Sequence, residues 1–175
     1  MSLRLRPLTV QDEEQALAAQ AELAPDDFMF LLDTTPGQPW ADYVGRLAAI
    51  RRGEALKEGW VPATFLVAEV DGEIVGRVSV RHELNGWLTR YGGHIGYGVR
   101  PQFRRRGYAT EILRQALQVA RAAGVERALV TCDLDNVGSA ATIERCGGVF
   151  EGIEPESEGT TAKRRYWIDV PPPPP

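Results

Sequence analysis

The sequence predicts a mixed α/β (α+β) domain with a central, mostly antiparallel twisted sheet of about seven strands, one parallel strand pair and about four flanking helices. Three observations support this prediction. Apolar residues follow helical spacing in the segment that ends at Gly53. Alternating apolar residues then flank Asp71-Gly72, a strong signal for an antiparallel hairpin. Residues 92–132 predict a strand, a helix and a strand, and thus two parallel neighbours joined by a right-handed crossover.

The composition is that of one globular domain. The 175 residues are 43% hydrophobic and 25% charged, which is enough for a substantial core. We expect residues 1–170 to form a single domain and the prolines at 171–175 to form an extended tail without a role in the fold. The alternative for this tail is a ligand of a proline-binding partner.

Charge, hydropathy and cysteine usage argue against several classes of protein. The formal net charge of −4 disfavours nucleic-acid binding, because proteins that bind the phosphate backbone carry a basic excess. No apolar stretch approaches membrane-spanning length and MSLRLRPLT lacks a signal-peptide core, so we expect a cytoplasmic protein without membrane contact. Cys132 and Cys146 lack CxxC spacing and companion histidines, which predicts free thiols and no metal site.

The N-terminal part of the chain predicts one short strand and two helices. The strand covers residues 3–8, and Thr9 with Asp12 resembles the cap of a helix that runs to about residue 24. Apolar spacing from residue 40 to residue 52 predicts a second amphipathic helix. The segment 26–38 between these helices gives no clear prediction.

Residues 63–70 and 73–84 predict the two strands of the hairpin. On the second strand Ile74, Gly76, Val78, Val80, His82 and Leu84 share an apolar face, and Val75, Arg77, Ser79, Arg81 and Glu83 share a mostly polar face. Residues 85–91 predict a loop and residues 92–99 a glycine-rich strand. On that strand Ile95, Tyr97 and Val99 face one way, and His94, Gly96 and Gly98 face the other. A face with so little side chain suits close approach by a ligand or another backbone.

The C-terminal half predicts two more helices and three more strands. Apolar spacing over residues 109–120 predicts the most regular helix, which Gly124 ends. Residues 127–132 predict a buried strand, and Asp135 or Asn136 caps a further helix that runs to about residue 146. Two final strands are predicted near residues 149–153 and 162–170.

The stretch of residues 99–113, VRPQFRRRGYATEIL, predicts a strand end, a basic loop and a helix start. Gly107 lets the backbone turn, and the unpaired N–H groups of the first helical turn point into the loop at the positive end of the helix dipole. Arg104, Arg105 and Arg106 add charge at the same place. This combination predicts a phosphate or pyrophosphate site. A solvated basic turn is the alternative.

Two motifs resemble those of the GNAT superfamily of acetyl-CoA-dependent N-acetyltransferases. Arg104-Arg-Arg-Gly107-Tyr-Ala109 fits the Q/R-x-x-G-x-G/A loop, whose amides bind the CoA pyrophosphate in that family, and Asn136-Val-Gly-Ser139 is similar to its N-x-x-S segment. The resemblance covers residues 3–170 and implies a GNAT-like fold. The cofactor-binding residues that it implies, together with the glycine-rich strand, are Tyr97, Val99, Arg104, Arg105, Arg106, Gly107, Tyr108, Ala109, Thr110, Asn136 and Ser139.

The resemblance implies an acyltransferase (EC 2.3.1-type) that uses acetyl-CoA as cosubstrate and no metal. The acetyl group would pass to a primary amine of a small molecule or peptide by direct attack in a ternary complex. This chain departs from the family at Ile143, where a tyrosine often protonates the departing thiolate. A non-catalytic CoA-binding sensor or assembly module on the same fold is therefore the alternative.

Two side chains are candidates for the general base that deprotonates the amine. His94 is the first candidate, because it lies on the glycine face of strand 92–99 and imidazole titrates near neutrality. Glu83 is the second, because it ends the adjoining strand on the polar face. A structural histidine and a solvated carboxylate are the alternatives.

The acceptor pocket is expected from the least family-like segments, residues 26–40 and 85–91, which both carry aromatic residues. The carboxylates that would favour a cationic amine there are Asp26, Asp27, Asp33 and Glu83. Scattered surface carboxylates are the alternative explanation of these four residues. Trp87, if exposed, and the late strands leave a homodimer open.

Overall fold

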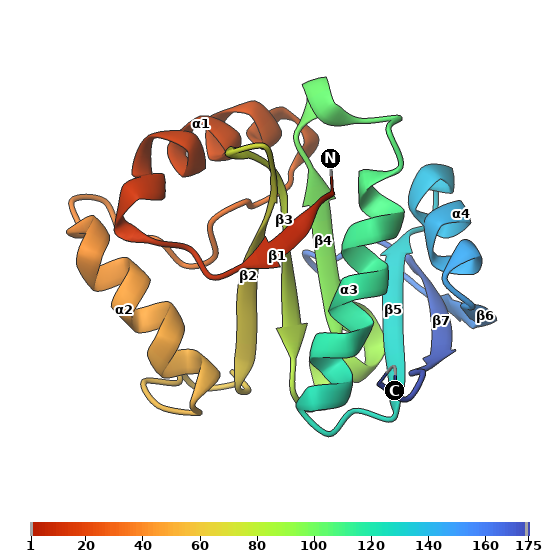
Figure 1. The fold of residues 1–175 in the computed structure, drawn as a ribbon. Helices are drawn as coiled ribbons and strands as arrows, with labels where there is room; N and C mark the ends of the chain where they lie inside the picture. Colours follow the sequence, from red (N-terminus) through yellow and green to blue (C-terminus); the bar gives the residue numbers. More distant parts are fainter. Residues whose placement is uncertain (1, 174) are drawn as a thin grey trace.

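The computed structural model describes residues 2–173 and 175, which form a seven-stranded mixed sheet in the order β1-β2-β3-β4-β5-β7-β6 (Figure 1). Neighbouring strands are antiparallel except the parallel pair β4 and β5. The strands are β1 (Arg4–Arg6), β2 (Ala63–Val70), β3 (Glu73–Arg81), β4 (Ile95–Val99), β5 (Arg127–Asp133), β6 (Val149–Glu154) and β7 (Lys163–Asp169). The α-helices in the described residues are α1 (Glu13–Leu23), α2 (Trp40–Arg51), α3 (Tyr108–Ala122) and α4 (Val137–Arg145). The predicted fold class is confirmed.

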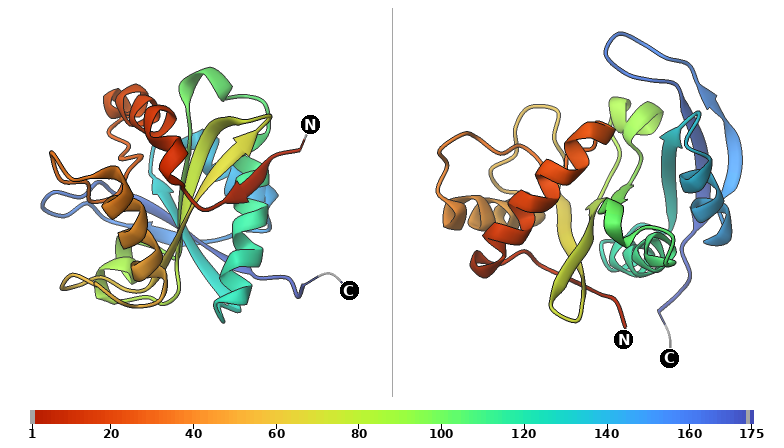
Figure 2. Two further views of the ribbon diagram at one scale, coloured as in Figure 1. Left: turned by 60° about the vertical axis from the view of Figure 1, so that its left-hand side comes forward. Right: turned by 90° about the horizontal axis from the view of Figure 1, so that it is seen from above.

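Each face of the sheet carries its own hydrophobic cluster. On one face α3 packs against Val78, Val80 and Ile95, and on the other α1 and α2 pack against Phe65 and Val67. Figure 2 shows α1 and α2 on one side of the strands and α3 on the other. Helices therefore cover both faces of β2 and β3, so the polar side chains of these strands lie between the sheet and a helical layer.

The predicted faces of β3 were wrong at its first two apolar residues. The pairing of β2 with β3 shifts register between Ala68 and Glu69. Ile74 consequently packs in the cluster under α1 and α2, whereas Val75 packs in the cluster under α3. A β-bulge adds one residue to a strand, and a strict period of two does not anticipate it.

The connection between β3 and β4 also differs from the prediction. The strand predicted to reach residue 84 ends at Arg81, and the strand predicted to start at residue 92 starts at Ile95. The predicted loop at 85–91 contains helical turns that end in a π-helix at Leu88–Gly92. The side chain of Asn85 starts these turns by accepting a hydrogen bond from the Leu88 N–H at 2.9 Å.

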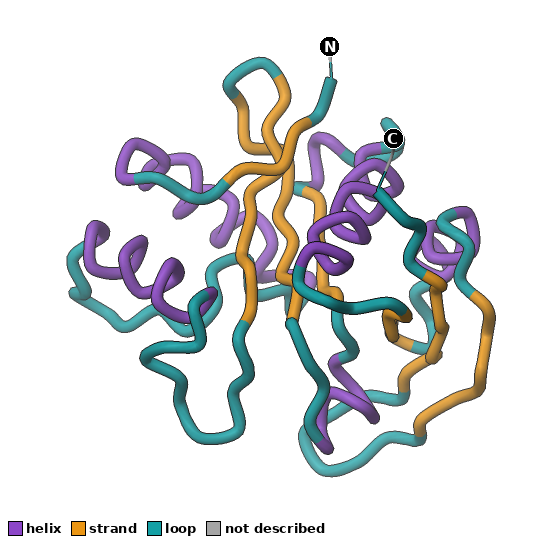
Figure 3. The backbone as a smooth tube through the Cα atoms, turned by 60° about the horizontal axis from the view of Figure 1, so that its bottom comes forward, coloured by secondary structure: helices purple, strands orange, loops and turns teal. Residues whose placement is uncertain are grey.

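Strands β4 and β5 lie together at one end and then separate. Their parallel pairing has a single register pair, Ile95 with Val130, although β4 continues to Val99. A split therefore opens in the middle of the sheet. The loops before and after α2, drawn in teal in Figure 3, bring residues 29–34 and 59–61 to the face of β2 and β3 that α1 and α2 cover.

Candidate active site

The loop before α3 is curled by two residues in the left-handed region. Arg105 has φ +63° and Gly107, the N-cap of α3, has φ +81°. Within 4 Å of the position that a Gly107 Cβ would take, no atom of the described chain lies, so backbone conformation and not crowding favours glycine here. The unpaired N–H groups of the first turn of α3 end at this loop, where an anion is favoured.

A cavity of about 810 Å³ joins this loop to the split between β4 and β5. Every predicted cofactor residue lines it except Arg106. Those that line it are Tyr97, Val99, Arg104, Arg105, Gly107, Tyr108, Ala109, Thr110, Asn136 and Ser139. The cavity also reaches the loop after α1 through Asp26, Asp27 and Phe28.

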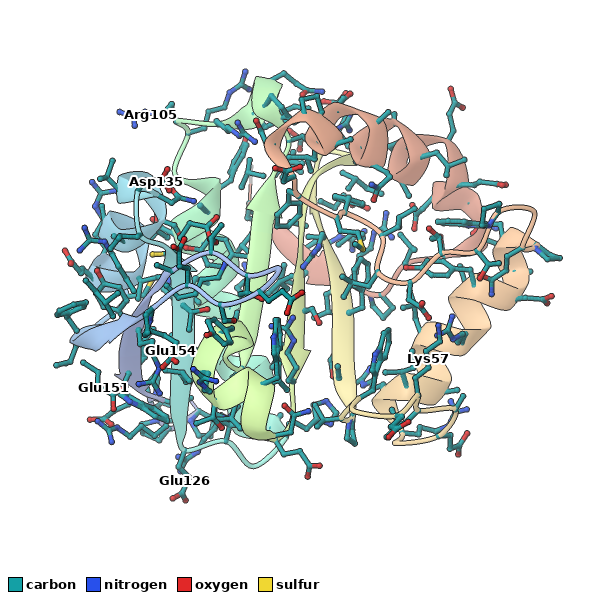
Figure 4. All side chains as sticks on the ribbon, turned by 180° about the vertical axis from the view of Figure 1, so that it is seen from behind. Lys57, Arg105, Glu126, Asp135, Glu151 and Glu154 are labelled. Atoms are coloured by element: carbon teal, nitrogen blue, oxygen red, sulfur yellow. The ribbon has the colours of Figure 1, made fainter. Side chains whose placement is uncertain are left out.

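The three arginines of the loop have different partners. Arg104 donates to the Val99 carbonyl at 3.1 Å and pairs with Asp26 at 2.6 Å, so it holds the loop in place. Arg106 donates to the carbonyl of Gln102. Arg105 is exposed and makes no ion pair within the described chain; Figure 4 labels it at the same end of the sheet as Asp135. Arg105 is therefore the arginine best placed to meet an anionic ligand.

Tyr97 and Ser139 meet across the split. The phenol oxygen of Tyr97 lies 2.9 Å from Ser139 Oγ. Burial raises the pKa of Tyr97 to about 12. Asn136 supports the pair, because its Oδ1 accepts a hydrogen bond from the Ser139 N–H at 3.0 Å and caps α4.

The position that carries tyrosine in much of the family is a core position in this chain. Ile143 is fully buried, and the backbone of Gly148 packs directly against it. Cys132 is buried close to Ser139, and burial raises the pKa of its thiol, so the thiolate is disfavoured. Cys132 and Cys146 are both free, as predicted.

Neither candidate base lines the cavity. His94 is buried at 7% exposure, and its Nδ1 accepts a hydrogen bond from the Leu129 N–H at 2.8 Å. Burial, together with the charge of Arg81, lowers the pKa of His94 to about 4. Glu83 is exposed and follows the end of β3. The imidazole of His94 ties β4 to β5 just before the split.

A second cavity, of about 750 Å³, begins one residue further along the chain. Phe28 lines the first cavity, and Met29 lines the second. The second cavity is bounded by parts of both segments expected to hold the acceptor, residues 29–34 and 87–88, and by the buried face of β2 and β3. The structure thus brings these two sequence-distant segments together.

Two arginines on this face were not predicted as site residues. Arg77 is 4% exposed, lies with its guanidinium 4.3 Å from the centre of the Phe28 ring, and donates to carbonyl oxygens of residues 29, 30 and 96. Arg81 lines the second cavity. Burial lowers the pKa of Arg77 to about 9 and that of Arg81 to about 10, so both stay charged at neutral pH. The sequence feature that could have indicated their role is the polar face of this strand, in a chain whose flanking segments are predicted as helices.

The described residues hold no group of three or more histidine, cysteine or acidic side chains that could bind a metal ion. Within the same ranges, 2–173 and 175, no helix has both the length and the apolar character needed to cross a membrane.

One cavity thus extends from the N–H groups at the start of α3 into the split between β4 and β5. A family profile described as "Acetyltransferase (GNAT) domain" matches residues 2–149. The chain belongs to the GNAT acetyltransferase family.

Solved structures of similar fold cover nearly the whole chain. RimL, a ribosomal L7/L12 alpha-N-protein acetyltransferase, is 19% identical with a TM-score of 0.70, over 97% of this chain and 91% of that chain. RimJ of Mycobacterium smegmatis, in complex with CoA-disulfide, is 23% identical with a TM-score of 0.67, over 96% and 82%. The microcin C7 self-immunity acetyltransferase MccE, in complex with acetyl-CoA and AMP, is 19% identical with a TM-score of 0.67, over 96% and 92%.

Proposed function

We propose that this protein transfers the acetyl group of acetyl-CoA to a primary amine by direct attack in a ternary complex. The observation that carries the proposal is the first cavity, in which the α3 N-terminal loop and the Tyr97–Ser139 pair line one continuous space. Similar structures hold CoA or acetyl-CoA, which supports the same ligand here. The second cavity supports an acceptor site, because Met29 in its wall is next in the chain to Phe28 in the wall of the first.

The residues of the first cavity fit acetyl-CoA by the chemistry of their donors. The N–H groups at the start of α3 and the exposed guanidinium of Arg105 suit the pyrophosphate. When bound, acetyl-CoA supplies an activated thioester. We assign Tyr97, Val99, Tyr108, Asn136 and Ser139 to the arm that leads from the pyrophosphate into the split.

The backbone of β4 offers N–H donors for the charge that develops on the carbonyl oxygen. Hydrogen bonds from Arg81 N to His94 O (2.7 Å) and from Arg100 N to Val75 O (2.8 Å) turn the even-numbered residues of β4 toward β3. The alternate residue Tyr97 thus turns its N–H toward the split. A fixed N–H donor at this place would stabilise the transition state more than the ground state.

The Tyr97–Ser139 pair is our candidate for the proton donor to the departing thiolate. It lines the cavity, whereas Ile143 is buried in the core. The phenol of Tyr97 is protonated at neutral pH, since its pKa of about 12 lies far above neutrality. The pair would supply to the thiolate the proton that a tyrosine at position 143 supplies elsewhere in the family.

His94 and Glu83 stay predictions for the general base, and the geometry around His94 does not favour it. A neutral imidazole whose Nδ1 accepts a hydrogen bond carries its proton on Nε2, so no lone pair is left to accept a further proton. We therefore propose that the amine enters in its neutral form and that water accepts its proton after attack.

Two measurements test the proposal. Acetyl-CoA at 100-fold over its Kd is expected to stabilise the protein by about 2.7 kcal/mol. The absence of a thermal shift at millimolar acetyl-CoA would contradict the assignment of acetyl-CoA as cosubstrate. Release of free CoA thiol is then measured with polyamines, amino acids, aminoglycosides and peptide N-termini. Saturable turnover excludes the purely binding sensor, whereas CoA binding without turnover on any amine favours it.

A further inference from the structure

The second cavity carries a positive charge that no carboxylate of the described chain compensates. Its titratable lining residues are Asp33 and Arg81. Asp33 pairs with Arg46 and, at 2.5 Å, with Lys57, so its charge is compensated within the protein. Arg81 makes no ion pair with a described residue. Counted with the two cations that pair with Asp33, the charge around the cavity is therefore positive.

The guanidinium of Arg81 also has hydrogen-bonding capacity to spare. Its Nη1 donates to the Gly92 carbonyl at 3.2 Å, and a guanidinium carries five N–H groups. Over residues 2–173 and 175, the buried side-chain nitrogen and oxygen atoms without a partner belong to Gln38 and Arg165. The remaining N–H groups of Arg81, a residue of the cavity wall, are thus not sealed in the protein.

The rest of the wall is mainly apolar. Its apolar side chains include Met29, Leu32, Ile50, Trp60, Phe65 and Trp87. Such a wall disfavours phosphate, because a strongly hydrated dianion needs more donors than one guanidinium supplies. It favours a carboxylate on an apolar body, since the body replaces water along the wall.

We infer that the second cavity binds an acceptor amine that also carries a carboxylate and an apolar or aromatic side chain, with the carboxylate paired to Arg81. The ligand class is thus an apolar α-amino acid. This inference rests on the proposed function, because it names the acceptor of that reaction. For this cavity it replaces the expectation of a cationic acceptor, since Asp33 is paired with cations, Asp26 and Asp27 line only the first cavity, and Glu83 lines neither.

The first experiment measures binding without turnover. The probe is 3-phenylpropionate, which has the ring and the carboxylate but no amine, and calorimetry compares wild type, Arg81→Met and Arg81→Lys. The control is Arg127→Met, because Arg127 is exposed, lines neither cavity and lies 3.6 Å from exposed Asp169. Cooperative thermal unfolding establishes that each variant is folded.

We expect 3-phenylpropionate to bind wild type and the control equally, and to bind Arg81→Met at least tenfold more weakly. Arg81→Lys is expected to lie between them, because an ammonium keeps the charge but loses the bidentate geometry. No binding to wild type would overturn the inference, and so would equal binding to wild type and Arg81→Met. Should Arg81→Met fail to fold, the comparison with Arg81→Lys decides.

The second experiment measures acetyl transfer to phenylalanine, 2-phenylethylamine and phenylalaninamide. We expect the preference for phenylalanine over the two amines without a carboxylate, as a ratio of kcat/KM, to fall at least tenfold in Arg81→Met. This comparison between enzymes cancels the intrinsic reactivity of each amine. An unchanged ratio overturns the inference and leaves the proposed function standing, as does better turnover of peptide N-termini than of free amino acids. Binding of 3-phenylpropionate through Arg81 without thiol release supports the carboxylate site and contradicts the proposed function.

Discussion

The phenol oxygen of Tyr97 lies 2.9 Å from Ser139 Oγ and connects β4 to the first turn of α4 across the split in the sheet. Both side chains line the first cavity. Asn136 holds the same turn of α4 through its hydrogen bond to the Ser139 N–H. Two hydroxyl groups are thus fixed beside the split, which is where we propose that the thiolate departs.

Removal of either hydroxyl is expected to slow catalysis. Tyr97→Phe and Ser139→Ala should each lower kcat by about 10²-fold, because general acid catalysis is worth that much, while KM for acetyl-CoA changes little. The double variant should be no slower than the slower single variant, since the pair acts as one unit. Steady-state thiol release measures all three rates.

Tyr91→Phe is the matched control for these variants. Its phenol donates to the Pro155 carbonyl at 3.0 Å, and it lines neither cavity. A kcat that is unchanged in Tyr97→Phe and in Ser139→Ala, with Tyr91→Phe also unchanged, would remove the pair from the mechanism.

Alanine substitutions of two glycines at opposite ends of α3 distinguish an effect on ligand binding from an effect on stability. Gly107 and Gly124 both have positive φ, +81° and +92°, and open space where a Cβ would lie. Alanine at either position should cost about 1 kcal/mol of unfolding free energy. Only Gly107→Ala is expected to weaken acetyl-CoA binding, because it disturbs the loop that presents the N–H donors. Chemical denaturation and calorimetry measure the two effects, and wild-type affinity in Gly107→Ala would contradict the loop assignment.

The parts of the fold with strong periodicity were predictable from the sequence. Helix α3, the hairpin of β2 and β3, and the crossover from β4 to β5 follow from apolar spacing and turn residues. The bulge near Ile74 was not predictable, because one added residue changes the face of its neighbours without leaving a signal in composition. The split also escaped prediction, since strand separation depends on packing between distant segments.

The candidate site also has parts that were predictable from the sequence and parts that were not. The anion loop around Gly107 was predictable, because backbone conformation and helix polarity are local properties. The burial of Arg77 was not, because the loop after α1 that covers it has no periodicity, and neither was the place of Arg81 in the wall of the second cavity. Their alternation with apolar neighbours is equally typical of a solvent-facing strand.

His94 predicts a specific dependence of stability on pH. Its pKa is about 4 in the folded protein, below the ordinary value of 6.5, so the unfolded chain binds more protons between these values. Stability should therefore fall as pH falls from about 6.5 to 4, by about 3 kcal/mol. His94→Asn keeps an acceptor for the Leu129 N–H without this titration, so its unfolding free energy should decline less. Denaturation at several pH values measures the difference, and equal declines would contradict this assignment.

The pH–rate profile tests whether His94 acts as a base. The Nδ1 of His94 already accepts a hydrogen bond from the Leu129 N–H, and the pKa of His94 is low. We therefore expect the decline of kcat/KM toward low pH, which reports the general base, to remain in His94→Asn. Glu83→Gln should also leave it in place, since Glu83 lines neither cavity. If this decline toward low pH disappears in one variant alone, the residue replaced in that variant is the base.

Arg81 is expected to reduce the stability of the unliganded protein. A largely desolvated guanidinium without a carboxylate partner costs folding free energy, and Arg81→Met removes the charge while it keeps an unbranched side chain against the apolar wall. The melting temperature should rise by about 2–4 °C for each 1 kcal/mol gained. The carboxylate probe 3-phenylpropionate should raise the melting temperature of wild type and not that of Arg81→Met, because only wild type gains a partner for the charge. Arg127→Met, at an exposed position, should show neither change. A lower melting temperature in Arg81→Met than in this control would mean that Arg81 stabilises the fold, and it would contradict the role of Arg81 as an unpaired charge that binds a ligand.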